Sequence, residues 1–238
     1  MTTRPNVSAI LRTTARLLTF RATSEELQCL DKWHLAFGLF CTWLAGMGRS
    51  WDNPKAELLQ HLGIGSMVYV FALSGFLWLI VAPLGPRHFS YRGLLAFVCL
   101  TAPPALLYAI PVERFFDAAT ARNINAGFLA FVAAWRVALL VFYLMRSARL
   151  TWLQTTVATL LPLSLIVSVV AFLGEAAHVM ATMGGTREKG PPADTAQQVL
   201  DFLIRLAGIV LLPLIGIYLV LVVVRARERS SATYHEPQ

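Results

Sequence analysis

A single arginine, Arg136, lies about halfway along an otherwise apolar run that covers residues 126–144. A guanidinium group cannot shed its charge in a protein. At the centre of a bilayer such a charge costs about 2.5–3.5 kcal/mol on insertion scales, so another group must compensate it. Backbone carbonyls, water, a lipid headgroup or a substrate anion are the expected partners, because the acidic residues nearest to the apolar runs all fall near predicted helix ends. These acidic residues are Asp31, Glu113, Asp117, Glu175 and Asp201.

Prolines interrupt the apolar runs at a similar depth. Pro103 and Pro104 lie about ten residues into the run 94–112, and each proline frees the carbonyl four residues earlier. Freed carbonyls are good acceptors for a guanidinium, and many transporters build their binding sites from interrupted helices at the membrane midplane. Asn125 shares a helix face with Arg136. The pattern predicts a ligand-binding site at Arg136, Asn125, Pro103 and Pro104. In the alternative interpretation the prolines only bend the helices, and neighbouring groups satisfy the backbone.

A second group of polar residues is predicted at one rim of the membrane domain. Carboxylates next to a histidine can act in acid–base chemistry or bind a metal. These residues are scattered, however, without a compact motif such as HExxH. A solvated rim is therefore the competing interpretation, and the sequence predicts no catalytic residue, no metal and no cofactor. The predicted rim consists of Asp52, Glu113, Arg114, Glu175 and His178.

The composition indicates that lipid is the main solvent of the chain. Of its 238 residues, 57% are hydrophobic and 14% are charged, whereas a soluble domain carries about 25% charged residues. Runs of this length favour helices that span a bilayer. We therefore expect an all-α, polytopic transmembrane bundle with six spans. The apolar runs cover residues 33–47, 62–84, 94–112, 126–144, 153–174 and 199–224. The first run is short, so it is either a tilted span, extended by Leu27 and Leu30, or a re-entrant helix.

The N-terminal segment has a different pattern from the apolar runs. Residues 1–24 hold four arginines and no acidic residue, and their apolar residues share one helix face. This pattern favours an amphipathic helix on an anionic membrane surface, although it also fits a mitochondrial presequence. Thr23 and Glu26 have the spacing of a capping box that starts the next helix. The expected domains are the amphipathic helix 1–24, the six-helix membrane domain 25–225 and a short tail, 226–238.

Two helix faces carry regularly spaced residues. Asp201 and Arg205 are spaced i, i+4 at the start of the last run, so they are expected to form an ion pair. A row of small residues on the fourth run allows close helix approach. This row packs either inside the bundle or against a second copy of the chain or another membrane protein. Its members are Ala126, Ala130, Ala134 and Ala138.

The distribution of basic residues predicts the orientation. The N-terminal tail, the second and fourth loops and the C-terminal tail together hold about twice as many Lys and Arg residues as the other loops. Cytoplasmic loops carry such an excess, so both termini are expected in the cytoplasm. The expected location is the inner (cytoplasmic) membrane of a bacterium, with the mitochondrial inner membrane as the alternative. The net charge of +7 is assigned to these loops, and no nucleic acid is expected as a partner.

The overall plan resembles small bacterial multi-pass membrane proteins with a basic cytosolic N-terminal tail and closely spaced spans. This resemblance covers hydropathy and loop lengths, and it implies a non-enzymatic role. The expected function is therefore transport-related or membrane-organising, with the lipid bilayer as the first partner. One alternative is a secondary transporter or channel with a midplane site at Arg136. Another is an intramembrane or periplasm-facing enzyme that acts on a lipid or envelope substrate through the polar rim.

Overall fold

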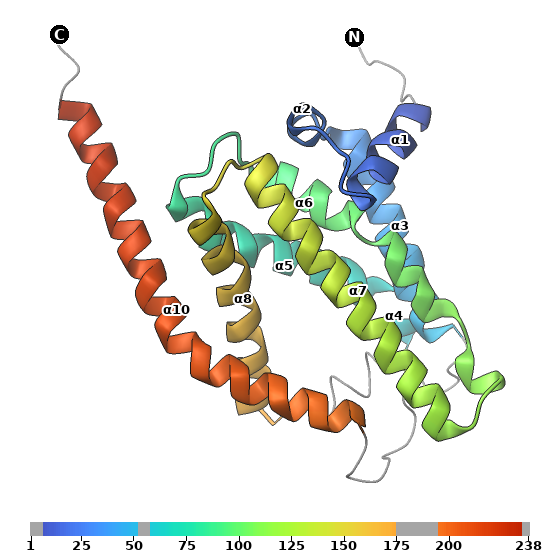
Figure 1. Ribbon diagram of the computed structural model, residues 1–238. Coiled ribbons are helices and arrows are strands. Elements are labelled where there is room, and N and C mark those ends of the chain that lie inside the picture. The colour runs from blue at the N-terminus through green and yellow to red at the C-terminus, as the bar shows by residue number, and fades with distance from the viewer. Residues whose placement is uncertain (1–6, 52–57, 175–194, 235–238) are drawn as a thin grey trace.

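The computed structural model describes residues 7–51, 58–174 and 195–234. Within these ranges every regular element is a helix and no strand occurs, so the predicted all-α class is confirmed (Figure 1). The α-helices are α1 (Val7–Leu18), α2 (Ser24–Gln28), α3 (Lys32–Ser50), α4 (Leu58–His61), α5 (Ile64–Val81), α6 (Tyr91–Leu100), α7 (Ala118–Arg146), α8 (Trp152–Phe172) and α10 (Thr195–Tyr234). The 3-10 helices are η1 (Ala82–Leu84), η2 (Pro103–Ala109) and η3 (Val112–Arg114).

Four helical segments of the described ranges are long and apolar enough to cross a membrane. A further pair of segments passes the same test together, but it is bent by 42°. The described residues thus contain four to five candidate spans, which agree with the second to sixth apolar runs. The four spans are Ile64–Leu84, Ala119–Arg146, Trp152–Phe172 and Gln198–Ser230, and the bent pair is Tyr91–Leu100 with Pro103–Arg114.

The first apolar run lies in α3, which is long enough to span a membrane but not apolar enough to count among these candidates. Lys32, His34 and Arg49 lie within this helix, and each lowers its hydropathy. The expected extension by Leu27 and Leu30 is wrong. Leu27 belongs to α2, and Leu30 lies in the connection between α2 and α3.

Asp31 sets the point at which α3 begins. As the N-cap residue, it accepts hydrogen bonds from the backbone N–H groups of Trp33, at 3.0 Å, and His34, at 3.1 Å. These bonds satisfy two of the donors that a helix leaves unpaired at its first turn. The chain therefore starts a new helix here instead of continuing α2.

The N-terminal segment folds back onto the bundle. The predicted capping box is confirmed, because Thr23 Oγ1 accepts from the Glu26 N–H at 3.2 Å and the Thr23 N–H donates to the Glu26 carboxylate at 2.7 Å. The box starts only the short α2. Leu17 of α1 and Leu27 of α2 are fully buried and belong to the main hydrophobic core. Residues 17–30 are therefore part of one folded unit with the helices that follow.

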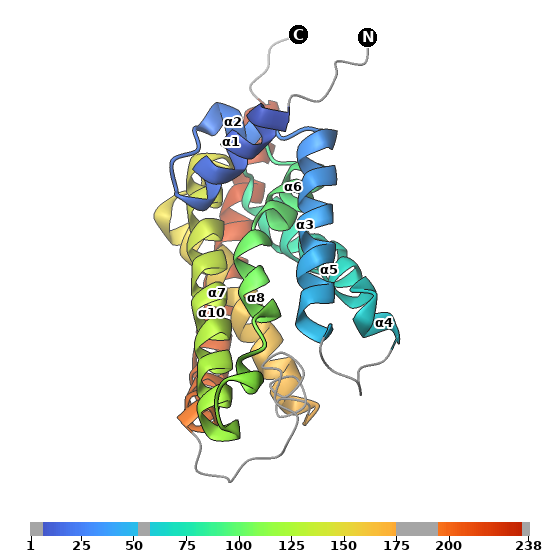
Figure 2. The same ribbon diagram turned by 90° about the vertical axis from the view of Figure 1, so that its right-hand side faces the viewer.

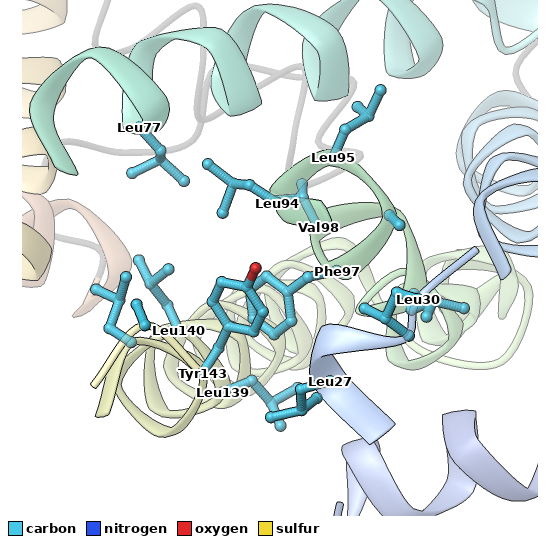
Figure 3. Close-up of a cluster of buried hydrophobic side chains, with 14 of the residues drawn as sticks. Leu27, Leu30, Leu77, Leu94, Leu95, Phe97, Val98, Leu139, Leu140 and Tyr143 are labelled. Carbon is cyan, nitrogen blue, oxygen red and sulfur yellow. The ribbon is translucent and has the colours of Figure 1, made fainter. Parts of the chain in front are cut away.

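The main core lies between α5, α6 and α7, beneath α1 and α2 (Figure 3). Its centre is a stacked aromatic pair, in which the rings of Phe97 on α6 and Tyr143 on α7 lie 4.2 Å apart. Leu94, Leu100 and Leu139 surround this pair and are fully buried. The burial of so many large side chains fixes α6 against α7 at one end of the molecule.

Hydrogen bonds join four segments at that end. Ser24 Oγ donates to the Arg146 carbonyl at 2.9 Å, and the Arg87 N–H donates to the Ala148 carbonyl at 2.9 Å. The Nε of Arg225 on α10 donates to the Leu84 carbonyl at 3.3 Å. The segment α1–α2, the connections after η1 and α7, and the C-terminal part of α10 thus gather at one end, here called the basic end (Figures 1 and 2). The distribution of basic residues predicts these same segments on one side of the membrane.

Candidate anion-binding site

Glycines bring α3 unusually close to its neighbours. A Cβ atom on Gly48 would lie 2.8 Å from the Cβ of Ala109 in η2, and one on Gly46 would lie 2.7 Å from Ser66 Oγ in α5. Real Cβ atoms essentially never approach other atoms so closely. The absence of side chains at these positions therefore allows the last turns of α3 to pack against both η2 and α5. Arg49 follows directly in that turn.

The break between α6 and η2 exposes a backbone acceptor. A 3-10 turn would require the Thr101 carbonyl to accept from residue 104, but Pro104 has no N–H. The next donor, the Ala105 N–H, bonds instead to the Ala102 carbonyl at 2.8 Å. The Thr101 carbonyl accepts from Arg136 Nε of α7 at 3.2 Å. Pro104 thus acts on Arg136 through the carbonyl that the break leaves available, and Pro103 begins η2.

A second arginine, Arg49, lies beside Arg136. Its guanidinium carbon is 4.8 Å from the centre of the Tyr108 ring in η2, in a cation–π arrangement. Its Nε is buried and has no hydrogen-bond partner. Both arginines are positively charged, so they repel each other. Tyr69 of α5 lies one turn after Ser66, the α5 residue nearest to Gly46. We call these four residues together with Thr101 the paired-arginine site.

The paired-arginine site is rich in donors and poor in acceptors. Each guanidinium has five N–H donors, and among the described residues only Arg136 Nε has a hydrogen-bond acceptor. No carboxylate of the described ranges forms a salt bridge with Arg49 or Arg136. Arg49 and Arg136 are half-buried and have no acidic partner among the described residues. Their two charges create a positive local potential that attracts an anion.

The main core closes the site toward the basic end. Arg136 lies ten residues before the end of α7, which is roughly 15 Å at 1.5 Å per residue. The next turns of α7 toward that end carry Leu139 and Tyr143, which are buried against α6. Tyr69, on the other hand, is 49% exposed. The site is therefore open at α5 and sealed between α6 and α7.

The structure separates the residues of the predicted ligand site. Asn125 forms its hydrogen bond away from Arg136: its Nδ2 donates to the Glu113 carboxylate at 2.7 Å. Arg114 stacks on Trp51, with its guanidinium carbon 5.1 Å from the ring centre. Glu113, Arg114 and Asn125 thus lie at the end of α7 opposite to the basic end. The other predicted rim residues, Asp52, Glu175 and His178, lie outside the described residues.

The remaining predicted sites are on α7 and α10. Asp201 and Arg205 are both exposed on α10, and their ion pair stays a prediction. Ala130, Ala134 and Ala138 are exposed on α7, and Ala126 is half-buried. Of the two alternatives for this alanine row, the exposure of three members favours a contact outside the described chain, and that contact stays a prediction. Within the described ranges, no three His, Cys, Asp or Glu side chains come together as metal ligands would.

Three members of the paired-arginine site, Arg49, Tyr69 and Tyr108, have no distinguishing pattern in the sequence. Their proximity depends on close packing between α3, α5 and η2, which no local pattern specifies. The available signal was the presence of Gly46 and Gly48 directly before Arg49, because small residues allow helices to approach closely.

No family model, curated protein or solved structure matches this chain. The features that bear on function are the geometry of the paired-arginine site and the apolar helices that surround it.

Proposed function

We propose that this chain is a non-enzymatic, multi-pass membrane protein that binds an anionic ligand at the paired-arginine site, in a transport-related role. One observation carries the proposal: Arg49 lies over Tyr108 of η2, Arg136 binds the Thr101 carbonyl just before η2, and no described carboxylate bridges either arginine. An arginine with only a structural role is usually paired, because an isolated buried charge is costly. A bound anion would remove both the repulsion and the cost of burial.

The broken helix beside the site supports transport rather than simple scaffolding. The 42° bend between α6 and η2 lies at Thr101, whose carbonyl binds Arg136. Secondary transporters place substrate sites at such interrupted helices, near the midplane. A change in this bend would move the Arg136 acceptor and so change the affinity of the site. A secondary transporter or channel is therefore the second candidate function.

The proposed topology has six passes, with α3 as the first. Its support is the gathering of four basic segments at one end, since an even number of passes returns the chain to the same side. We place the basic end in the cytoplasm of a bacterium, by the excess of Lys and Arg. The face of α1 that carries Val7 and Leu11 is exposed, at 61% and 48%. This face would enter the membrane interface at the basic end.

The test measures anion binding by the full-length protein, purified in detergent, through its thermal unfolding. Sodium salts of chloride, acetate, sulfate and phosphate are titrated at constant ionic strength. We compare the parent with Arg136→Gln, Arg49→Gln and Arg136→Lys. Arg205→Gln is the matched control, because Arg205 also lies in an apolar run but is exposed on α10. The control also reports the general stabilisation that sulfate and phosphate give to any protein.

We expect at least one anion to raise the Tm of the parent and of Arg205→Gln with a saturable curve. The rise should disappear in Arg136→Gln and Arg49→Gln. Arg136→Lys should keep part of it, since lysine keeps the charge but loses the planar arrangement of donors. A saturable rise that survives in both glutamine variants would overturn the proposal, and so would a parent that responds neither to these anions nor to an anionic lipid. If Arg136→Gln has a higher Tm than the parent, and no anion changes the Tm of either protein, Arg136 binds no ligand.

A further inference from the structure

We infer that the ligand of the paired-arginine site is a dianionic phosphate group, an inference that rests on the proposed anion-binding function. The charge of the site is the first argument. Arg49, over the Tyr108 ring, and Arg136, bonded to the Thr101 carbonyl, supply two positive charges, and within the described part of the chain no acidic side chain bridges them. A monoanion would leave one of the two charges uncompensated, whereas a dianion neutralises both.

The unused donors are the second argument. Arg136 uses its Nε for the Thr101 carbonyl, so the edge formed by its two terminal nitrogens is left for a ligand. That edge binds two oxygens of one phosphate in a bidentate manner. The Nε of Arg49 is buried and without a partner, which leaves a donor of the second guanidinium for another oxygen. Spherical or planar monoanions do not offer oxygens in these different directions.

The tyrosines are the third argument. Tyr108 lies under the Arg49 guanidinium, and Tyr69 lies one turn after Ser66, the α5 residue nearest to Gly46. Neither hydroxyl forms a hydrogen bond with the described residues. A phenol O–H can donate to a further phosphate oxygen. Donors thus come from α3, α5, η2 and α7, and acceptors are few. A tetrahedral oxyanion accepts hydrogen bonds at every oxygen, so it complements donors that come from four different elements.

Two sources can present this phosphate to the site. A free phosphate or a soluble phosphate ester would arrive from water. A lipid with a phosphomonoester headgroup would arrive from the bilayer past Tyr69, which is 49% exposed and follows Val68, at 63% exposure. The shared chemistry is the terminal phosphate with two negative charges. The experiment must therefore contain both an aqueous and a membrane arm.

In the aqueous arm, inorganic phosphate is titrated against the detergent-purified full chain, with acetate and chloride as monoanionic controls at equal ionic strength. In the membrane arm, the protein is reconstituted in phosphatidylcholine vesicles with increasing phosphatidic acid, and phosphatidylglycerol is the monoanionic control. Both arms record the Tm of the parent, Arg49→Gln, Arg136→Gln and Arg205→Gln. Tyr108→Phe is a milder variant that removes one hydroxyl and keeps the ring under Arg49.

We expect phosphate or phosphatidic acid to raise the Tm saturably in the parent and in Arg205→Gln. The glutamine variants should lose about tenfold or more in apparent affinity, and Tyr108→Phe should lose less. A response in the aqueous arm identifies a soluble source, and a response only in the membrane arm identifies a lipid. An equal response to acetate, chloride or phosphatidylglycerol overturns the inference but leaves the proposed function intact. No arginine-dependent response to any of these anions overturns both.

Discussion

Gly48 of α3 and Ala109 of η2 approach each other so closely that a Cβ on Gly48 would lie 2.8 Å from the Cβ of Ala109. This contact fixes the distance between the last turn of α3 and η2. Arg49 and Tyr108 are the chain neighbours of these two residues, and they form the cation–π contact of the paired-arginine site. The position of Arg49 is therefore set by the absence of a side chain one residue earlier.

Gly48→Ala tests this relationship. The added methyl group must push α3 and η2 apart, and overpacking of this kind costs about 1–3 kcal/mol. We expect a lower Tm and a weaker anion response, because Arg49 moves away from Tyr108. Gly65→Ala on α5 is the matched control, since a Cβ there meets nothing within 4 Å and alanine is favoured over glycine in a helix by about 1 kcal/mol. Equal changes in Tm and in the anion response of Gly48→Ala and Gly65→Ala would show that the close contact does not position Arg49.

Pro104→Ala tests the role of the helix break. Alanine at this position supplies the N–H that proline lacks, and this donor competes with Arg136 Nε for the Thr101 carbonyl. We expect thermal stability to be kept or raised, but the anion response to change, because Arg136 loses its fixed acceptor. Pro213→Ala in α10, remote from the site, should leave the anion response unaltered. An unchanged response in Pro104→Ala would mean that the Thr101 carbonyl does not orient Arg136.

Leu17→Ala and Leu11→Ala test whether α1 is an integral part of the fold. Leu17 is fully buried in the main core, whereas Leu11 is 48% exposed on the same helix. Truncating a buried leucine typically costs about 2–5 kcal/mol, so Leu17→Ala should lower the Tm strongly. Leu11→Ala should leave the Tm in detergent nearly unchanged. Similar effects of the two substitutions on thermal unfolding would indicate that α1 does not pack on the bundle as described.

The local features of the sequence predicted the fold well. The five later apolar runs correspond to the candidate spans and the bent pair, because a bilayer imposes helix length and hydropathy directly on the chain. The capping box at Thr23 and Glu26 also depends only on neighbouring residues. Each of these patterns lies within a single segment of the chain.

The candidate site was predicted only in part. Arg136 stood out because its charge contrasts with its own run. Its neighbour Arg49 comes from another helix, and the contact depends on how Gly46 and Gly48 pack. Asn125, chosen because it shares a helix face with Arg136, binds Glu113 instead. Helix periodicity gives the direction of a side chain, but tertiary packing decides which partner it meets.

The cap of α3 predicts an acid-dependent loss of stability. Burial alone would raise the pKa of Asp31, but hydrogen bonds from the His34 backbone and ring and from the Trp33 N–H hold this pKa below its ordinary value of 3.8. Because the folded-state pKa is depressed, the contribution of Asp31 is present above about pH 4 and is lost as the pH falls through the folded value. Asparagine caps a helix without this charge.

We therefore expect the Tm difference between the parent and Asp31→Asn to be largest near neutral pH and to shrink below about pH 4. Thermal unfolding followed at several pH values measures this difference. A difference that stays constant down to about pH 3 would show that the charge of Asp31 does not contribute to the cap.

The alanine row of α7 provides a test for self-association. Ala130, Ala134 and Ala138 are exposed, and we propose that they contact a second copy of the chain, because small residues spaced by four allow close helix approach. We expect Ala134→Cys to form a disulfide-linked dimer in membranes under mild oxidation, in a Cys29→Ser background that removes the exposed native thiol. Ala133→Cys is also exposed but points away from the row, so it should react much less. Equal cross-linking of the two variants would indicate random collision, and none from Ala134→Cys would leave the row facing lipid.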